Sequence, residues 1–138
     1  DRLSNIDTRA AEFLHSAEVE KDRVRRFLSY FVSIEIATHQ SFKSTDGTST
    51  EILCRALPSQ VYGGGAAFLE QKYSEVRSLA DRFVWCSIVC WSNITDREIA
   101  EFRRLKKIRD DIAHGNVGDV TQADVEAVRS LALAILRA

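Results

Sequence analysis

The chain has 138 residues, of which 45% are hydrophobic and 28% are charged, and its formal net charge is −1. This size and composition suit one globular domain over residues 1–138, with a hydrophobic core of its own. The near-neutral charge argues against a general nucleic-acid coat but leaves room for a local basic patch, and the longest apolar run, around residues 83–91, is too short and too interrupted to span a membrane.

A single proline and apolar residues spaced three and four apart predict helices throughout the chain. The first helix is expected over about residues 7–17 and the second over about residues 21–42. A polar loop should follow at residues 44–50, and then a short helix at residues 52–57. The three consecutive glycines at residues 63–65 predict a flexible joint.

The second half of the chain has clearer helix signals. A long helix is expected over residues 66–91. Thr95 and Glu98 form a capping box, which starts a helix over residues 95–114, and Thr121 caps the last helix. Together these elements predict an all-α fold, an antiparallel bundle of four main helices with short extra helices.

The three cysteines indicate a reducing compartment. Cys54, Cys86 and Cys90 include no CxxC pair, and the last two lie one helical turn apart in an apolar stretch. We therefore expect three free thiols in a cytoplasmic protein, with Cys86 and Cys90 turned toward the bundle and no metal site.

A polar stripe follows the helix predicted over residues 95–114. Its members are spaced four, three and four residues apart: Arg103, Lys107, Asp110 and His114. The carboxylate of Asp110 lies one turn before His114, where it would orient the imidazole or raise its pKa. We predict that these two side chains are neighbours and that His114 is at least partly exposed. Arginine suits phosphate and histidine moves protons near neutral pH, so Arg109 and His114, near the end of the same helix, indicate chemistry or binding at a phosphodiester.

Two charged residues interrupt apolar faces. Glu35 points the same way as Phe31 on the second helix, and Arg109 lies beside Leu105 at the edge of the apolar face of its own helix. Glu35 is either an edge residue whose carboxylate reaches water or a core residue that holds an arginine or a tyrosine. Because each charge is costly to bury alone, we predict that the two helices pack together and that Glu35 accepts hydrogen bonds from Arg109 or a close polar neighbour.

Residues 107–116, Lys-Ile-Arg-Asp-Asp-Ile-Ala-His-Gly-Asn, resemble the signature of the HEPN superfamily (higher eukaryotes and prokaryotes nucleotide-binding domains). The hallmark is an arginine, an adjacent polar residue, and a histidine after four to six intervening residues, late in a helix. Arg109, Asp110 and His114 match it at the shortest spacing. The aromatic-rich segment at residues 30–35, with its acidic residue, is also similar. Within the superfamily the chain is most similar to prokaryotic domains of the Apea type.

The resemblance implies a metal-independent endoribonuclease that works as a homodimer and needs no cofactor. RNA carries its own nucleophile, the 2'-OH, so His114 would act as acid or base while Arg109 stabilises the phosphate. Asp110 would orient one of the two, and the products would be a 2',3'-cyclic phosphate and a 5'-OH. The neighbouring residues expected to bind RNA are Arg103, Lys107 and Asn116.

A second class of function competes with the enzyme. Related domains also act as non-catalytic modules that dimerise, bind RNA or a nucleotide, and regulate a partner. The mildly acidic balance and Asp110, where the superfamily often has asparagine, favour this alternative, whereas the intact Arg109 and His114 favour the ribonuclease, which we place first. The expected setting is phage defence, a toxin–antitoxin pair or a stress response. Because the chain contains no methionine, we expect a piece of a longer protein, with an antitoxin or a fused effector domain as a further partner.

Overall fold

The computed structural model describes the backbone of residues 2–138 and the side chains of residues 8–138. Within these residues the fold is all-α, as predicted, with no strand. No helix described is long and apolar enough to cross a membrane. The helices are α1 (Arg2–Val19), α2 (Arg23–Ser44), α3 (Ser49–Cys54), the 3-10 helix η1 (Ser59–Val61), α4 (Tyr62–Glu75), α5 (Leu79–Val89), α6 (Asp96–Ala113) and α7 (Gln122–Leu136).

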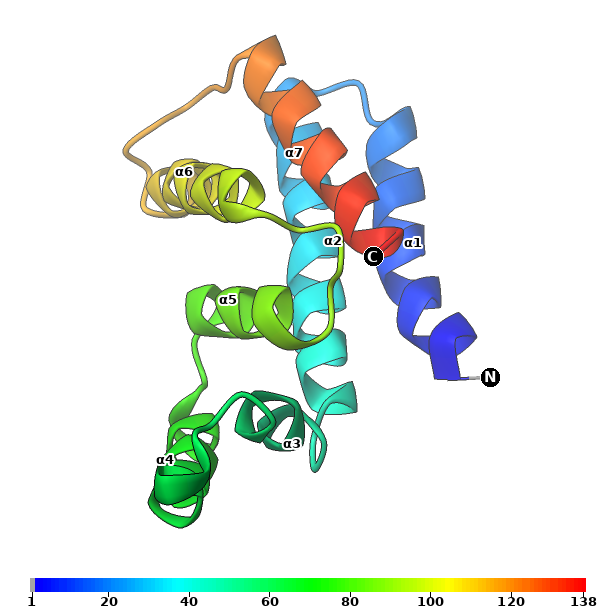
Figure 1. Ribbon diagram of the computed structural model, residues 1–138. Helices are drawn as coiled ribbons and strands as arrows, with labels where there is room; N and C mark the ends of the chain where they lie inside the picture. The colour runs from blue at the N-terminus through cyan, green and yellow to red at the C-terminus, as the bar shows by residue number, and fades with distance from the viewer. Residues whose placement is uncertain (1) are drawn as a thin grey trace.

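Helix α2 is the centre of the molecule. It packs against α1, α7, α5 and α6. Helices α1 and α2 run antiparallel and α7 lies beside them, while α5 and α6 lie across the other side of α2 (Figure 1). Helices α3 and α4 gather at the end of the molecule where α2 finishes (Figure 1). This arrangement places the C-terminal half of α6 where it can reach the side of α2.

Stacked phenylalanine rings join α2, α5 and α6. Phe83 and Phe102 are fully buried, and their ring centroids lie 4.0 Å apart with the planes 6° from parallel. The ring of Phe31 lies 6.0 Å from that of Phe102 and 6.4 Å from that of Phe27. Such large buried rings supply much of the apolar contact in a small core. Their stacking fixes α6 against α2 and so sets the position of the residues that follow Phe102.

The structure corrects two expectations about the middle of the chain. Gly63–Gly65 form no joint, because they lie inside the first turn of α4, where nothing requires a positive φ. The long helix expected over residues 66–91 is two helices, α4 and α5. The backbone is extended at Val76, and the Ser78 side chain accepts a hydrogen bond from the backbone N–H of Asp81 at 3.1 Å, which makes Ser78 the N-cap of α5.

The polar segment at residues 44–50 is also partly helical. It turns at Gly47, which has a φ of +82°, and α3 then begins at Ser49, earlier than the helix expected over residues 52–57. Ser49 and Thr50 are buried, so this segment packs against the rest of the molecule despite its polarity. Its short helix ends at Cys54 and leads through Pro58 into η1.

The predicted helix caps are confirmed. The backbone N–H of Thr95 donates to the Glu98 carboxylate at 2.8 Å at the start of α6, and the Thr121 side chain accepts from the N–H of Asp124 at the start of α7. Gly115 follows α6 with a φ of +74°, a left-handed conformation that favours glycine. The caps therefore fix both ends of the helix that carries the polar stripe.

The cysteines are free thiols, as predicted. Cys54 and Cys86 are buried, and the Cys86 thiol donates to the backbone oxygen of Thr38 at 3.8 Å. Cys90 is the C-cap of α5 and is exposed, although its thiol still lies against the buried thiol of Cys86.

Candidate functional site

Arg109 occupies the border between α6 and α2. Helix α6 buries Phe102 and Leu105 against the core, so the residue one turn after Leu105 emerges at the edge of that contact. The Arg109 guanidinium carbon lies 5.1 Å from the centroid of the Phe31 ring on α2. A cation over an aromatic face is attracted by the ring, so the contact favours this position of the guanidinium.

The structure pairs Glu35 with Arg109, as predicted, and the contact is an ion pair. The Arg109 Nη2 atom lies 3.2 Å from Glu35 Oε1, and about 30% of each side chain is exposed. Glu35 is therefore a half-buried residue that holds an arginine and keeps part of its side chain exposed. Burial removes water from its carboxylate and raises the pKa of Glu35, and the nearby charge of Arg109 offsets only part of this effect.

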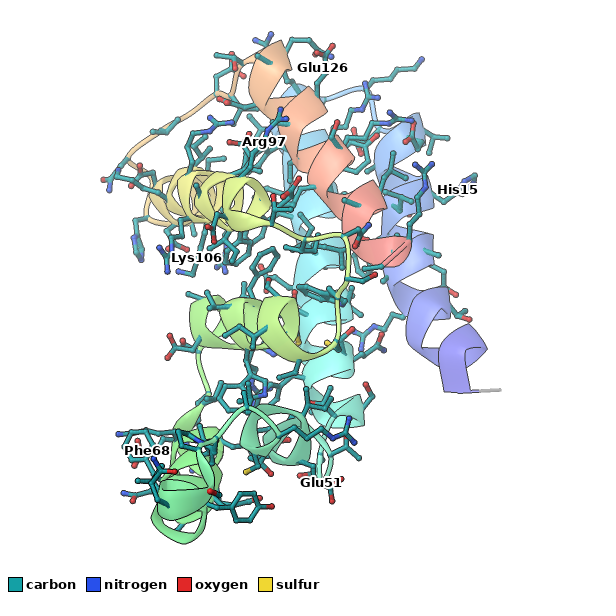
Figure 2. All side chains as sticks on the ribbon, viewed as in Figure 1. His15, Glu51, Phe68, Arg97, Lys106 and Glu126 are labelled. Carbon is teal, nitrogen blue, oxygen red and sulfur yellow. The ribbon has the colours of Figure 1, made fainter. Side chains whose placement is uncertain are left out.

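Asp110 is held mainly by Lys106. Its Oδ2 accepts a hydrogen bond from Lys106 Nζ at 2.8 Å, and its Oδ1 lies 3.5 Å from Arg109 Nη1. The hydrogen bond from Lys106 is the largest of the effects that lower the pKa of Asp110. Lys106 is on the side of α6 nearer α5 (Figure 2). The Lys106 contact is a functional detail that the sequence analysis missed, although the four-residue spacing from Lys106 to Asp110 was its signal.

His114 is exposed at the end of α6, as predicted. It is the C-cap residue, and its backbone N–H donates to the backbone carbonyl oxygen of Asp110 at 3.0 Å. The two side chains are close enough for the imidazole to contribute to the lowered pKa of Asp110. Among the described side chains, no hydrogen bond joins Asp110 to His114, because Lys106 and Arg109 take the carboxylate oxygens.

The residues expected to bind RNA are spread along α6 and the loop that follows it. Arg103, Lys107 and Asn116 are exposed, but Lys107 is paired with Asp111 at 2.9 Å. Arg103 lies eleven residues before His114, a rise of about 16 Å along a helix. The structure therefore joins Arg109 to Glu35 and Asp110 and places His114 near Asp110 at the end of the same helix, and it leaves Arg103 about three turns before His114.

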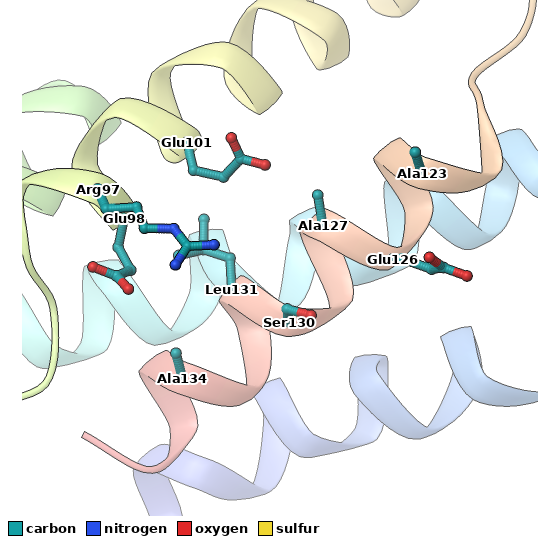
Figure 3. Close-up of a pocket in the computed structure, with 9 residues that line it drawn as sticks. All are labelled: Arg97, Glu98, Glu101, Ala123, Glu126, Ala127, Ser130, Leu131 and Ala134. Carbon is teal, nitrogen blue, oxygen red and sulfur yellow. The ribbon is translucent and has the colours of Figure 1, made fainter.

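A groove between α6 and α7 lies away from these residues. It has a volume of about 470 Å³ and lies between Arg97, Glu98 and Glu101 on α6 and small residues of α7 such as Ala127 (Figure 3). None of the residues of the polar stripe lines it. In the described part of the chain, no group of three or more histidine, cysteine or acidic side chains could hold a metal ion.

Glu35→Ala should lower the free energy of unfolding by about 1–2 kcal/mol, because it removes the closer of the two carboxylates that face the half-buried Arg109. Glu35→Gln should cost less, since the amide oxygen can still accept from the guanidinium. Urea unfolding measures both changes. The matched control is Glu75→Ala, which breaks the more exposed pair with Lys72 and should cost about 0–1 kcal/mol. Equal losses for Glu35→Ala and Glu75→Ala would contradict the special role of the Glu35 contact.

The pH dependence of the same variants gives a second check. The folded protein has a raised pKa at Glu35, so the protonated form is favoured by folding. Relative to Glu35→Gln, the wild type should therefore gain stability as the pH falls through the raised pKa toward 4.5, the ordinary glutamate value, and lose it as the pH rises. If the stability of the wild type relative to Glu35→Gln instead rises as the pH rises, the burial of the carboxylate would be contradicted.

Comparisons with protein-family models, with curated proteins and with solved structures found no match to this chain.

Proposed function

We propose that this protein is a metal-independent endoribonuclease of HEPN type that cleaves RNA through the 2'-OH. One observation carries the proposal: Glu35 and Phe31 hold Arg109 in place a little over one turn before the exposed imidazole of His114. A held cation and an accessible proton carrier near the end of one helix are the two kinds of group that cleavage of a phosphodiester by side chains requires. The arginine and histidine also complete the motif that resembles the HEPN signature.

The proposed reaction needs one proton acceptor and one proton donor. The 2'-OH loses its proton to a histidine, its oxygen attacks the adjacent phosphorus, and the bond to the 5' oxygen of the next nucleotide breaks as that oxygen gains a proton. The products are a 2',3'-cyclic phosphate and a 5'-OH. Arg109 offsets the negative charge that builds on the phosphate. One chain supplies one such histidine, so we propose that a second copy pairs the ends of α6 about a twofold axis and supplies the other.

The contacts of Arg109 suggest how a phosphate would enter. Glu35 approaches Nη2 to 3.2 Å, whereas Asp110 approaches Nη1 to only 3.5 Å and already has Lys106 as a closer partner. A phosphate oxygen at Nη1 would therefore replace the weaker of the two contacts and leave the Glu35 contact intact. In this proposal Glu35 positions the arginine, and Lys106 keeps the Asp110 carboxylate turned away from the phosphate.

The alternative is a non-catalytic module that dimerises and binds RNA, a nucleotide or a protein partner such as an antitoxin or a fused effector. The observation that favours it is that both terminal nitrogens of Arg109 already face carboxylates, which also suits a purely structural arginine. The proposed setting is the same for either function: phage defence, a toxin–antitoxin pair or a stress response in the cytoplasm.

The deciding experiment incubates the protein with mixed RNA in excess EDTA and identifies the ends of the products. We expect cleavage that EDTA does not inhibit, with 2',3'-cyclic phosphate and 5'-OH ends. Light scattering at micromolar concentration should report a dimer. A monomer that leaves RNA intact would overturn the ribonuclease and favour the binding module, while cleavage that stops in EDTA would overturn the side-chain mechanism.

A further inference from the structure

A cleft between α1 and α2 adjoins the contact between Glu35 and Arg109. Its volume is about 300 Å³, which lies at the lower end of the range for small-ligand pockets. Glu35 is one of its lining residues, so the cleft begins at the carboxylate that holds Arg109. From there it follows one face of α2, through His39 to Lys43, and Arg9 lines it from α1. The rise from Glu35 to Lys43 is about 12 Å.

The inner surface of this α1/α2 cleft combines apolar walls with an unpaired amide. Val32 and Ile36 line it and are each half-buried. The Oε1 atom of Gln40 is buried and, among the described residues, has no hydrogen-bond partner. Buried polar groups normally find a partner, so a rotation of the Gln40 side chain toward the cleft would let a donating ligand satisfy this acceptor. An amide can also pair with the edge of a nucleobase through its oxygen and its NH₂ group.

His39 adds a hydrogen-bonding ring to the cleft. Its Nδ1 atom lies 3.0 Å from Nη1 of Arg82 on α5, and an arginine can only donate, so Nδ1 accepts. Burial and the charges of Arg82 and Lys43 lower the pKa of His39, which keeps the ring neutral near neutral pH. In a neutral ring whose Nδ1 accepts, the proton is on Nε2. The ring can therefore donate one hydrogen bond or stack on a base.

The rim of the cleft is positively charged. Arg9 and Lys43 are exposed, and among the described side chains neither has an ion-pair partner within 4 Å. The one carboxylate in the lining, Glu35, is matched by Arg109. Two unpaired cations beside a base-sized cleft are the arrangement that holds a phosphate next to a base.

We propose that the α1/α2 cleft binds a nucleotide of the RNA strand next to the cleaved bond. The base lies against Val32 and Ile36 and is hydrogen-bonded by Gln40, and the phosphate lies between Arg9 and Lys43. This inference rests on the proposed function, because Glu35 joins the cleft to Arg109. A free mononucleotide has the same base and phosphate, so the test must separate it from RNA.

The test measures RNA binding without cleavage. A fluorescently labelled single-stranded RNA is titrated with protein carrying His114→Ala, and the Kd is measured at several salt concentrations. Adding Arg9→Ala and Lys43→Ala together should weaken RNA binding about tenfold. It should also reduce the salt slope, which is the steepness with which log K falls as log salt concentration rises, by about 1.4, because each lost phosphate contact on a single strand contributes about 0.7. The matched control is Lys21→Ala with Arg25→Ala, which removes the same charge at the other end of α2 and should leave the Kd and slope unchanged.

A third variant tests the base contact. Gln40→Leu keeps the size of the side chain and the charge of the cleft, so it should weaken binding at least about fivefold with the salt slope unchanged. Competition experiments distinguish an RNA strand from a free mononucleotide as the ligand. Unlabelled RNA should displace the labelled strand at far lower concentration than AMP, CMP, GMP or UMP. A mononucleotide that competes as well as RNA would overturn the RNA assignment.

Failure of this inference can be told apart from failure of the proposed function. One outcome is that the Arg9 and Lys43 variant and the Gln40 variant each bind RNA as tightly as the Lys21 and Arg25 control, while the wild type still cleaves RNA. This result would overturn the role of the cleft and leave the ribonuclease proposal intact. RNA binding that depends on Arg9, Lys43 and Gln40 in a protein that never cleaves would overturn the ribonuclease and leave the cleft standing.

Discussion

Phe102→Ala should lower the free energy of unfolding by about 3–5 kcal/mol. Phe102 is fully buried, and its ring stacks on Phe83 at 4.0 Å and lies 6.0 Å from Phe31. Alanine removes most of this buried surface and leaves a cavity where α2, α5 and α6 meet. Because α6 carries Arg109 and His114 on the turns that follow, the same change should also loosen the contact between Arg109 and Glu35.

Urea unfolding followed by circular dichroism measures the loss. The control is Phe68→Ala on α4, because the Phe68 side chain is 56% exposed and its removal should change stability by less than about 1 kcal/mol. Similar losses for the two substitutions would show that the ring stack does not hold α6 in place. The cleavage rate of the Phe102 variant should be measured well below its unfolding temperature, so that displacement of Arg109 is separated from global unfolding.

The sequence predicts well those parts of the fold that are determined by residues close together in the chain. Helix α6 is the clearest example, since the capping box at Thr95 and Glu98 and the glycine at residue 115 define its two ends. The contact between Glu35 and Arg109 was predictable for a different reason. Two opposite charges on apolar faces are each expensive to bury alone, and packing the two helices together is the arrangement that satisfies both.

The errors arose where a local signal had two interpretations. The apolar spacing continues through residues 76–78, but the Ser78 cap decides that the chain starts a new helix there. The glycines at residues 63–65 are poor helix formers, yet they are helical in α4. Asp110 lies four residues after Lys106 and four residues before His114, so the spacing allows either contact, and in the structure the hydrogen bond to the carboxylate comes from Lys106.

The α1/α2 cleft lay beyond sequence reasoning altogether. Its lining depends on how Arg9 from α1 meets one face of α2, and on Arg82 of α5 reaching His39. These are tertiary contacts between residues as much as 43 positions apart in the chain. The four-residue spacing of Glu35, His39 and Lys43 places them on one face of α2, but only the packing of its neighbours shows that this face is left open.

His114→Ala should reduce the rate of RNA cleavage at least about 100-fold, because general acid–base catalysis by a placed histidine contributes about 10²–10⁴ to a rate. The measurement is single-turnover cleavage of a defined RNA in EDTA. The matched control is His15→Ala, since His15 is also an exposed histidine but lies on α1 (Figure 2). That variant should cleave at the wild-type rate. Equal rates for the two variants would remove His114 from the reaction.

The stability of the His114 variant decides whether such a loss is chemical. His114 is exposed at the C-terminus of α6, where a protonated imidazole stabilises the helix by about 0.3–1 kcal/mol. Its removal should therefore leave the urea midpoint almost unchanged, and the dimer should persist in light scattering. A folded, dimeric variant that binds RNA but no longer cleaves it would assign the proton transfer to His114. Loss of folding together with cleavage would instead make the histidine a structural cap.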